Sequence, residues 1–359
     1  MILTKMTVLM SVLMVCLGCD NKSISQDQTA ATSIGIVADH LDPSVRKVFQ
    51  DSQDNYWFMG DSGVYKTKDS LIVWLRAEDG LHSNHIRYIQ EDKQGDLYFE
   101  SDEGVTKYDG KTFQQLWIKE GFETDWKLGD NDMWFQIGFS NKGPYRYDGD
   151  TLYRLEFPST STEVKFFELY PNAGYSPYGL YYHFTDSKNN VWFGTTSMGA
   201  ARFDGNSVGW MYEDYLTHTP EGGDFGIRSI FEDSHGDFWI CNTRERFHVS
   251  GQSADASGEV KIEYTKSPGV GFKTDTGEMY YPYFFSMVED KAGDLWMASY
   301  DEGVYRKSGD ELIHYPLKEG DETVLTFLFY KDNSGGIWLT THNFGLYKYD
   351  GQNFVRFSM

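Results

Sequence analysis

The sequence predicts an all-β fold, a seven-bladed β-propeller of four-stranded antiparallel blades. The composition favours strands joined by tight turns, because 17% of the residues are aromatic and 36 are glycine. A turn rich in aspartate, followed by an aromatic residue, recurs seven times along the chain. The copies lie far enough apart, at roughly 40 residues or more, for each to hold four short strands.

Each copy begins with an alternating strand such as "IRYIQE" and an Asp-x-x-Gly-type turn. The second strand carries an anchoring aromatic residue, and these residues are Trp57, Tyr98, Trp134, Trp192, Trp239, Trp296 and Trp338. A glycine turn, a third strand that often ends in Tyr-Asp-Gly, and an aromatic fourth strand complete the unit. One antiparallel sheet of this size cannot bury both faces, so such units stack radially. We therefore expect the anchoring aromatics to pack between blades.

Two parts of the repeat pattern are irregular. In the fifth copy, "RERFHVSG" (244–251) stands where the glycine turn and the Tyr-Asp-Gly turn are expected. The last copy completes its own outer strand near Phe357, so the way in which the ring closes is open. Residues 34–37 could add a strand to this last copy, although the sequence does not require it.

The amino-terminal segment predicts export and a lipid anchor. Lys5 precedes an apolar stretch over 8–17 that is too short to span a bilayer and is typical of a secretory signal. Leu17-Gly18-Cys19 matches a bacterial lipoprotein signal, although Cys16 stands where leucine is usual, and an ordinary secretory peptide is the alternative. We predict a lipoprotein signal peptide over 1–18, a flexible tether acylated at Cys19 over 19–40, and the propeller over 41–359. The expected location is the bacterial cell envelope, on the periplasmic side or the cell surface.

The charge excludes some partners. The chain has 54 acidic and 32 basic residues and a formal net charge of −22, so it repels nucleic acid and anionic lipid headgroups. We therefore expect no nucleic-acid partner, and membrane attachment only through the lipid on Cys19. After cleavage Cys241 is the other cysteine left, and we expect it to be a small buried apolar residue rather than part of a disulfide framework.

The repeat resembles a known family. The segment Ile86–Phe113, "IRYIQEDKQGDLYFESDEGVTKYDGKTF", is similar to the two-component regulator propeller repeat, and the resemblance covers about residues 44–357. It implies an extracellular ligand-binding sensor propeller, in a family of which many members respond to glycan fragments. Those sensor kinases carry two rings, whereas this sequence carries one, with no kinase or DNA-binding segment after Met359. We therefore expect a stand-alone lipoprotein that cannot signal by itself.

One face of the propeller is predicted to bind the ligand. Three blade connectors, at about 158–181, 212–228 and 265–284, are enlarged and lie on the face that also carries the turns between second and third strands. Insertions on one face of a repeat protein usually mark its binding face, and tyrosines suit sugar rings and extended peptides. The alternative is that these tyrosines pack the insertions and that the charged residues form a solvated rim. The candidate ligand-binding residues are Asp102, Glu103, Tyr175, Tyr178, Tyr215, Arg244, Tyr281, Tyr283, Tyr300, Asp301, Glu302, His342 and Asn343.

The acidic turns resemble the start of a calcium loop but do not complete it. From Asp290 the alternating ligand positions hold Ala292 and Asp294, and the twelfth position holds Asp301 rather than glutamate. The set also changes between copies, whereas the turn residues persist. The sequence therefore predicts structural turns, with no bound metal and no cofactor.

No residue pattern predicts catalysis, so a non-catalytic binding module is favoured. Its partner is expected to be an extracellular ligand, such as a glycan, or an envelope protein. One alternative is a propeller enzyme, a glycosidase or a lyase similar to the streptogramin lyases. Turnover that is lost in His342→Ala and Asp301→Ala variants would favour this alternative. A further alternative is a structural docking platform for envelope assembly.

Overall fold

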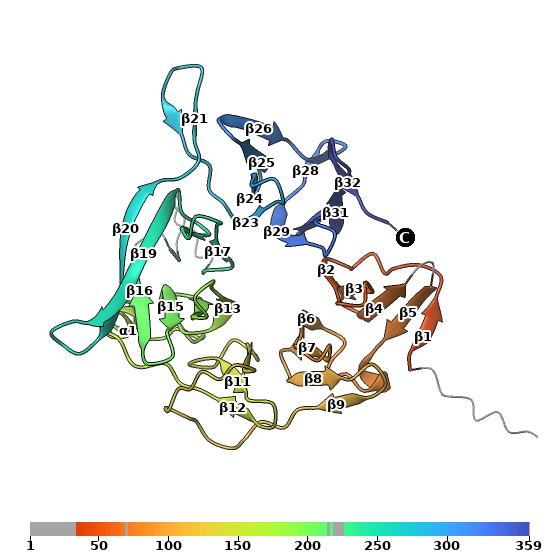
Figure 1. The fold of residues 1–359 in the computed structure, drawn as a ribbon, viewed down its shortest axis with the longest axis horizontal. Helices are drawn as coiled ribbons and strands as arrows, with labels where there is room; N and C mark the ends of the chain where they lie inside the picture. Colours follow the sequence, from red (N-terminus) through yellow and green to blue (C-terminus); the bar gives the residue numbers. More distant parts are fainter. Residues whose placement is uncertain (1–33, 69–70, 214–215, 218–225, 359) are drawn as a thin grey trace, which may run out of the picture. The chain divides into compact units, whose positions relative to one another are not determined.

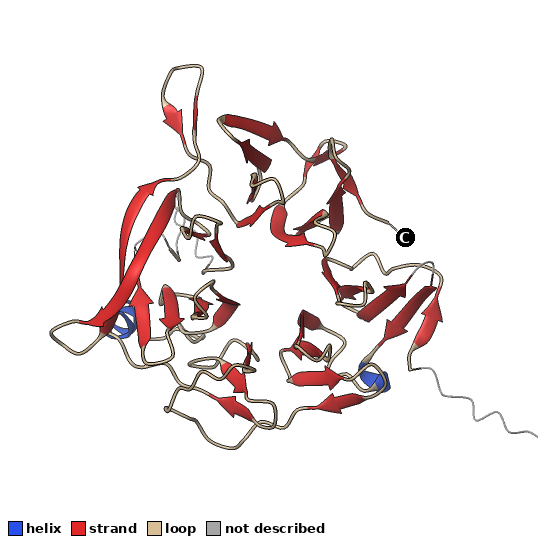
Figure 2. Cartoon of the chain, in the orientation of Figure 1, coloured by secondary structure: helices blue, strands red, loops and turns tan. Residues whose placement is uncertain are grey.

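Each of the seven predicted repeats forms one group of strands, and the groups lie around a common centre (Figure 1). The structure is a computed structural model that describes residues 34–68, 71–213, 216–217 and 226–358. Strands and turns make up almost all of this part of the chain (Figure 2). The described residues belong to one unit, Ile34–Met359, whereas the predicted signal peptide and Cys19 lie outside them.

The first three blades follow the chain in order. Blade 1 contains β1 (Ile36–Ala38), β2 (Lys47–Gln50), β3 (Tyr56–Gly60), β4 (Gly63–Lys68) and β5 (Leu71–Leu75), followed by the short 3₁₀ helix η1 (Ala77–Asp79). Blade 2 contains β6 (Ile86–Glu91), β7 (Leu97–Ser101), β8 (Val105–Tyr108) and β9 (Phe113–Gln115). Blade 3 contains β10 (Met133–Phe135), β11 (Tyr145–Tyr147) and β12 (Leu152–Arg154).

The remaining blades have four strands each. Helix α1 (Ser161–Leu169) leads to blade 4, with β13 (Leu180–Thr185), β14 (Val191–Thr195), β15 (Ala200–Phe203) and β16 (Val208–Met211). Blade 5 contains β17 (Ile230–Glu232), β18 (Phe238–Ile240), β19 (Glu245–Ala254) and β20 (Val260–Pro268). The hairpin β21 (Phe272–Lys273) and β22 (Met279–Tyr280) precedes blade 6, with β23 (Ser286–Glu289), β24 (Leu295–Ser299), β25 (Gly303–Ser308) and β26 (Glu311–Tyr315). The hairpin β27 (Lys318–Glu319) and β28 (Glu322–Thr323) precedes blade 7, with β29 (Thr326–Lys331), β30 (Ile337–Thr341), β31 (Leu346–Tyr349) and β32 (Phe354–Arg356).

The anchoring aromatics lie in the interior. All seven are at most 5% exposed, and Trp57, for example, packs with Leu81, Ile89 and Phe99 of the next blade. In five of the copies the indole N–H donates to the turn aspartate six residues earlier, as in Trp296 and Asp290 at 2.9 Å. The turn and the aromatic residue are therefore one structural device, which explains why they recur together.

The turn aspartates are occupied by protein donors. In Asp290, Oδ1 accepts hydrogen bonds from the N–H groups of Ala292 (2.8 Å) and Asp294 (3.0 Å), while Oδ2 accepts from Trp296. Burial alone would raise the pKa of Asp290, but these N–H donors hold it below its usual value. Among the residues that the structure describes, no group of three or more His, Cys, Asp or Glu is placed to hold a metal ion.

Blade 1 has five strands and blade 3 has three. The predicted boundary between the tether and the propeller is wrong, because residues 36–38 form a strand of blade 1. β1 pairs with β5 at the outside of blade 1, with Ile36 opposite Trp74, because the exposed edge of β5 offers free backbone groups. Residues 36–38, assigned to the tether, therefore belong to the first blade and do not extend the last one. Blade 3 has three strands. The segment 118–123 before it runs parallel to β12 at the outer side of the blade and does not form an inner strand.

Side-by-side packing of blades 7 and 1 closes the ring. The backbone N–H of Asn333 donates to Gln50 Oε1 (2.9 Å), and its side-chain amide donates to the carbonyl of Asp51 (2.8 Å). Beneath these bonds Trp338 shares a core with Phe58, Tyr65 and Ile72 of blade 1. No strand is exchanged between the two blades, so closure depends on this buried interface.

The irregular fifth repeat forms a long hairpin. The segment that lacks the expected glycine turn lies in β19, which pairs with β20 from Glu245 opposite Pro268 to Ala254 opposite Val260. The hairpin contacts blade 4, because β20 pairs in parallel with β16 at Trp210 and Lys261. Because β20 extends to Pro268, the third enlarged connector begins later than the predicted residue 265.

In the described part of the chain, no helix has the length and apolarity needed to cross a membrane.

Blade 3 lacks an inner strand, and side chains of blade 2 satisfy its open edge. Gln90 Nε2 donates to the carbonyl of Trp134 (2.9 Å), and the backbone N–H of Gln136 donates to Glu100 Oε2 (3.1 Å). A cavity of about 290 Å³ lies here, lined by residues of β6 and β13 such as Tyr88 and His183. Polar side chains of blade 2 therefore pair with two backbone groups of blade 3 that an inner strand would otherwise cover.

Candidate ligand-binding site

One position of the repeat places a side chain near the propeller axis in six blades. It lies five residues before the turn aspartate, within two residues of the start of each inner strand. Its residues are Arg46, Arg87, Tyr181, Arg228, Phe285 and Phe327. The anchoring aromatics occupy the spaces between blades, so this position is not needed for their packing. It combines three arginines with three aromatic residues.

Blades 6 and 7 supply an aromatic side of the site. The ring centroids of Phe285 and Phe327 lie 5.2 Å apart, and His342 lies 4.5 Å from Phe327. Tyr300 completes the group at 5.5 Å from His342. Tyr300 and His342 follow β24 and β30 directly, so the turns after the second strands meet the beginnings of the inner strands at this end of the blades.

The other blades supply a basic side. The guanidinium of Arg87 lies over Phe139 at 4.1 Å, and that of Arg228 lies over Tyr181 at the same distance. Phe139 and Tyr181 are themselves in contact, with centroids 5.3 Å apart. We call the whole set the axial cluster; its members are Arg46, Arg87, Phe139, Tyr181, Arg228, Phe285, Tyr300, Phe327 and His342.

Several cationic side chains influence the axial cluster and its surroundings. Burial and the positive charges of Arg228 and Arg46 lower the pKa of His342, so both arginines act on the aromatic side. Lys47 donates to the carbonyl of Arg87 (2.7 Å), and burial together with the charge of Arg87 lowers its pKa to about 8. The described acidic partner of Arg87 is Asp102, at 2.7 Å.

A buried carboxyl group stands beside this positive charge. Glu100 is fully buried on β7, and burial raises its pKa to about 8, although the Gln136 N–H and the charges of Arg87 and Lys47 oppose the effect. Its Oε1 has no hydrogen-bond partner in the described part of the chain. The side-chain amide of Gln136 is also buried and lies near the Tyr88 hydroxyl, but makes no hydrogen bond there. A carboxyl that is mostly neutral near pH 7 adds little negative charge beside the ion pair of Arg87 and Asp102.

The structure brings three of the sequence-predicted residues into or beside the axial cluster. Asp102 pairs with Arg87, and Tyr300 and His342 form part of the aromatic side. The turns that follow the second strands of blades 2, 6 and 7 contribute these side chains.

Four other predicted residues gather at the border of blades 5 and 6. Arg244 lies over Tyr283 at 4.0 Å, and Tyr281 packs close to Gly271. Glu302 accepts hydrogen bonds from the hydroxyl groups of Tyr280 and Tyr305, so its carboxylate is already engaged. This group ties the hairpin β21–β22 to blade 6.

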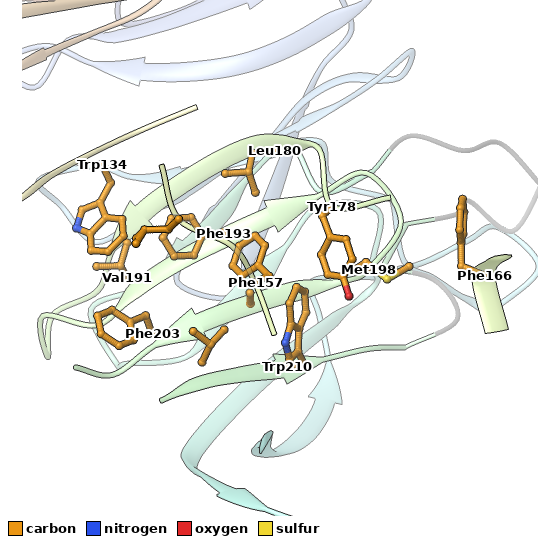
Figure 3. Close-up of a cluster of buried hydrophobic side chains, with 13 residues drawn as sticks. Trp134, Phe157, Phe166, Tyr178, Leu180, Val191, Phe193, Met198, Phe203 and Trp210 are labelled. Carbon is orange, nitrogen blue, oxygen red and sulfur yellow. The ribbon is translucent and has the colours of Figure 1, made fainter. Parts of the chain in front are cut away.

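The remaining predicted residues have other places. Tyr178 is 1% exposed and lies in the core of blade 4 with Phe157 and Trp210 (Figure 3), so it is not available to a ligand. Tyr175 packs on Phe166 of α1, since the enlarged connector must cover its own helix. The amide of Asn343 holds the backbone of the preceding connector, accepting from the Leu325 N–H and donating to the Thr323 carbonyl.

Glu103 and Asp301 are exposed, and no contact joins their side chains to the axial cluster. Tyr215 lies outside the described residues. The sequence analysis did not predict that the arginines and phenylalanines of the axial cluster belong to the site. The repeat nevertheless contains a pattern that could have predicted them. The position five residues before the turn aspartate varies in charge between copies, whereas the turn does not.

No family model and no curated protein matches the chain. Among solved structures it is similar to the extracellular domain of the hybrid two-component system BT4673 from B. thetaiotaomicron, with a TM-score of 0.55 and 18% identity over 87% of this chain. The chain spans only 38% of the length of that domain. It is also similar to virginiamycin B lyase from Staphylococcus aureus, with a TM-score of 0.54 and 13% identity over 86% of this chain and 95% of that one.

A third similar structure is YCF48 bound to D1 peptide, with a TM-score of 0.51 and 10% identity over 86% of this chain and 95% of that one. At these identities the likeness shows the fold, an all-β propeller, shared by sensor domains, a lyase and a peptide-binding protein. The two-component regulator propellers that the repeat resembles are thus represented among the structural neighbours.

Proposed function

We propose that this chain is a non-catalytic, extracytoplasmic propeller that binds its ligand at the axial cluster. The observation that carries the proposal is the convergence of aromatic and basic side chains from several blades at one end of the inner strands. Phe285, Phe327 and His342 meet from blades 6 and 7, while Arg87 and Arg228 reach in from blades 2 and 5. Ligand-binding sites commonly combine aromatic side chains with a few charged hydrogen-bond donors.

Two comparisons support this proposal. The BT4673 structures are extracellular sensor domains, which agrees with an extracytoplasmic location. YCF48 is bound to D1 peptide, which supports a binding role for a propeller of this fold. The candidate ligands are a glycan or an envelope protein, and the enlarged connectors near residues 158–181 and 269–284 would extend the binding face.

A binding screen tests this function. The purified mature protein is applied to a broad glycan array and used to capture partners from envelope extract, in parallel with a Phe327→Ala/His342→Ala double variant. We expect at least one ligand, bound about tenfold more weakly by the double variant because the aromatic side of the site is lost. A Val355→Ala variant, changed at an exposed position on β32, serves as the matched control. No ligand at all, or full retention by the double variant, would contradict the proposal.

The proposed lipid anchor has its own test. Metabolic labelling with a fatty acid is expected to tag the wild-type chain and to leave a Cys19→Ser variant unlabelled, because acylation requires the cysteine thiol. The variant should also move from the membrane fraction to the soluble fraction. Label that persists in the variant would show that the lipid is absent from Cys19.

A further inference from the structure

We infer that the chain has a second ligand site, separate from the axial cluster, which takes a neutral saccharide of two or three rings. The site is a cavity of about 660 Å³ beside β16, the outer strand of blade 4. We call it the rim cavity; residues of 124–126, 158–161, 206–210 and 257–260 line it, together with Val164. No member of the axial cluster lines it, so the inference goes beyond the proposed function.

Three departures from the regular repeat meet at the rim cavity. The first is the enlarged connector 158–181, whose helix α1 begins at the cavity. The second is the long β19–β20 hairpin of the irregular fifth repeat, whose tip lies beside α1 (Figure 1). The third is the stretch that follows 118–123, the segment at the outer side of blade 3. Blade 2 forms its four strands without such additions, and insertions that gather at one place in a repeat protein usually mark a binding site.

Hydrogen bonds hold the walls of the rim cavity in place. At the hairpin tip, Glu259 Oε2 accepts a hydrogen bond from the Ser161 N–H at the start of α1 (3.0 Å). The hairpin is also tied to blade 4 by the pairing of β20 with β16. The indole N–H of Trp126 donates to the carbonyl of Glu156 (2.9 Å), which fixes the third wall. The cavity is therefore preformed, and its volume lies within the range of about 300–1,000 Å³ that is usual for small-molecule sites.

The charges around the rim cavity disfavour an anionic ligand. Asp125 and Glu259 are acidic, and none of the described residues that line the cavity is Lys, Arg or His. Asp125 is exposed and pairs with Lys127 (3.1 Å), while Glu259 pairs with Lys261. A cationic ligand would compete with these lysines for the two carboxylates. A neutral ligand meets neither the repulsion nor the competition.

The rest of the lining combines small polar groups with apolar surface. Hydroxyl side chains come from all four segments, and they include Thr124, Ser159, Ser161, Ser207 and Ser257. The apolar part of the lining includes Trp126, Trp210, Val164 and Val208. A saccharide ring carries hydroxyl groups at its edge and C–H groups on its faces, so it matches both kinds of lining.

The polar groups of the lining are only partly used within the protein. Ser257 donates its proton to Asp255 and is therefore engaged. Ser159 and Ser207 each accept a hydrogen bond from another side chain, and they donate none to any residue that the structure describes. Asn206 is exposed, and its side-chain amide makes no hydrogen bond in the described part of the chain. Hydroxyl donors and an amide that both donates and accepts thus remain for a ligand.

Calorimetric titration of the purified protein tests the inference, with maltotriose, cellotriose, mannotriose and trigalacturonate as probes. We expect at least one of the three neutral trisaccharides to bind, and to bind at least about tenfold more tightly than trigalacturonate, which the carboxylates and the net charge repel. Raising the salt concentration should leave the affinity for the neutral probe unchanged, because no ion pair forms. Failure of all three neutral probes to bind, or equal binding of trigalacturonate, overturns the inference.

Two variants locate the bound saccharide. Asn206→Ala should weaken its binding about fivefold or more, because a hydrogen-bonding group is lost, whereas Gln352→Ala, at the corresponding turn position of blade 7, should not change it. Val164→Trp fills part of the cavity and should weaken binding about tenfold or more, whereas Leu169→Trp, at the far end of α1 and outside the lining, is its control. All four positions are exposed, so the variants should fold normally, and their melting temperatures check that point.

The double variant Phe327→Ala/His342→Ala separates this inference from the proposed function. It should bind the neutral trisaccharide as tightly as the wild type, because neither residue lines the rim cavity. If the double variant loses the trisaccharide while Asn206→Ala and Val164→Trp keep it, the saccharide binds at the axial cluster. In that case the inference fails and the proposed function stands. Loss in the two rim variants alone supports the inference, whatever ligand the axial cluster takes.

Discussion

Replacing Trp338 by alanine is expected to lower the free energy of unfolding by about 3–5 kcal/mol, since a large buried aromatic side chain leaves a cavity. Trp338 is 2% exposed and lies where blades 7 and 1 meet, in contact with Phe58 and with Phe357 at 4.8 Å. No strand is shared between these two blades, so the packed interface has no covalent or sheet-like support. The substitution therefore removes packing from the interface that closes the ring.

A second component of this effect is electrostatic. The indole N–H of Trp338 donates to Asp332 Oδ2 (2.9 Å), and this bond helps to keep the pKa of the carboxyl group far below its usual value although burial opposes it. A Trp338→Phe variant keeps much of the packing and loses this donor, so it should cost about 1–2 kcal/mol. Urea denaturation followed by circular dichroism measures both variants. A cost below about 1 kcal/mol for Trp338→Ala would show that the ring closes in another way.

Replacing Glu100 by glutamine is expected to stabilise the protein, by roughly 2–4 kcal/mol at about pH 8.5 and by much less at about pH 5. The pKa of Glu100 is raised from 4.5 in the unfolded chain to about 8 in the fold. The folded state therefore holds the proton more tightly than the unfolded state between these values, and stability falls as the pH rises through this window. Glutamine cannot ionise, so the variant escapes this loss.

Thermal denaturation of the two proteins across this pH range measures the effect. The difference in melting temperature should grow with pH and level off above the folded pKa of Glu100. The matched control is Glu103→Gln, which removes an exposed carboxylate from the turn that follows the same strand and should leave the pH dependence unchanged. An equal shift at both ends of the range would mean that Glu100 is ionised throughout.

The buried charge of this region is consistent with a site maintained for binding. Lys47 and Glu100 are both desolvated, each at a cost to stability, and Glu100 Oε1 has no partner in the described residues. Proteins commonly retain such unfavourable groups at functional sites. If the proposed ligand binds at the axial cluster, we expect Glu100→Gln to alter its affinity as well as the stability of the free protein.

Local repetition accounts for how much of the fold could be predicted. The distance of six residues between Asp290 and Trp296 places a carboxylate and an indole on one turn and strand, and the same pair recurs at Asp186 and Trp192. Such contacts need only neighbouring residues, so the sequence pattern reveals them together with the four-strand unit. Cys241 is likewise buried, as its apolar surroundings predicted.

Tyr178 and Asn343 show why individual site residues were harder to predict. Both lie in segments on the predicted binding face, yet one fills the core of blade 4 and the other holds a connector backbone. Polar and aromatic residues in a connector serve packing and recognition equally well, and only their surroundings separate the two roles. The missing inner strand of blade 3 was hidden for a related reason, because residues 118–123 could have paired on either side of that blade.

The chain's repeats thus suffice for the propeller, its turns and its buried anchors, since these depend on residues close together in the sequence. The closure between blades 7 and 1, the extra strand β1 and the axial cluster depend on contacts between distant segments. Arg46 and His342 stand nearly 300 positions apart in the sequence, yet the curvature of the ring brings their charges and rings to one axis. Whether Arg46 and His342 come close together depends on the angle between successive blades. This angle follows from packing around the whole ring.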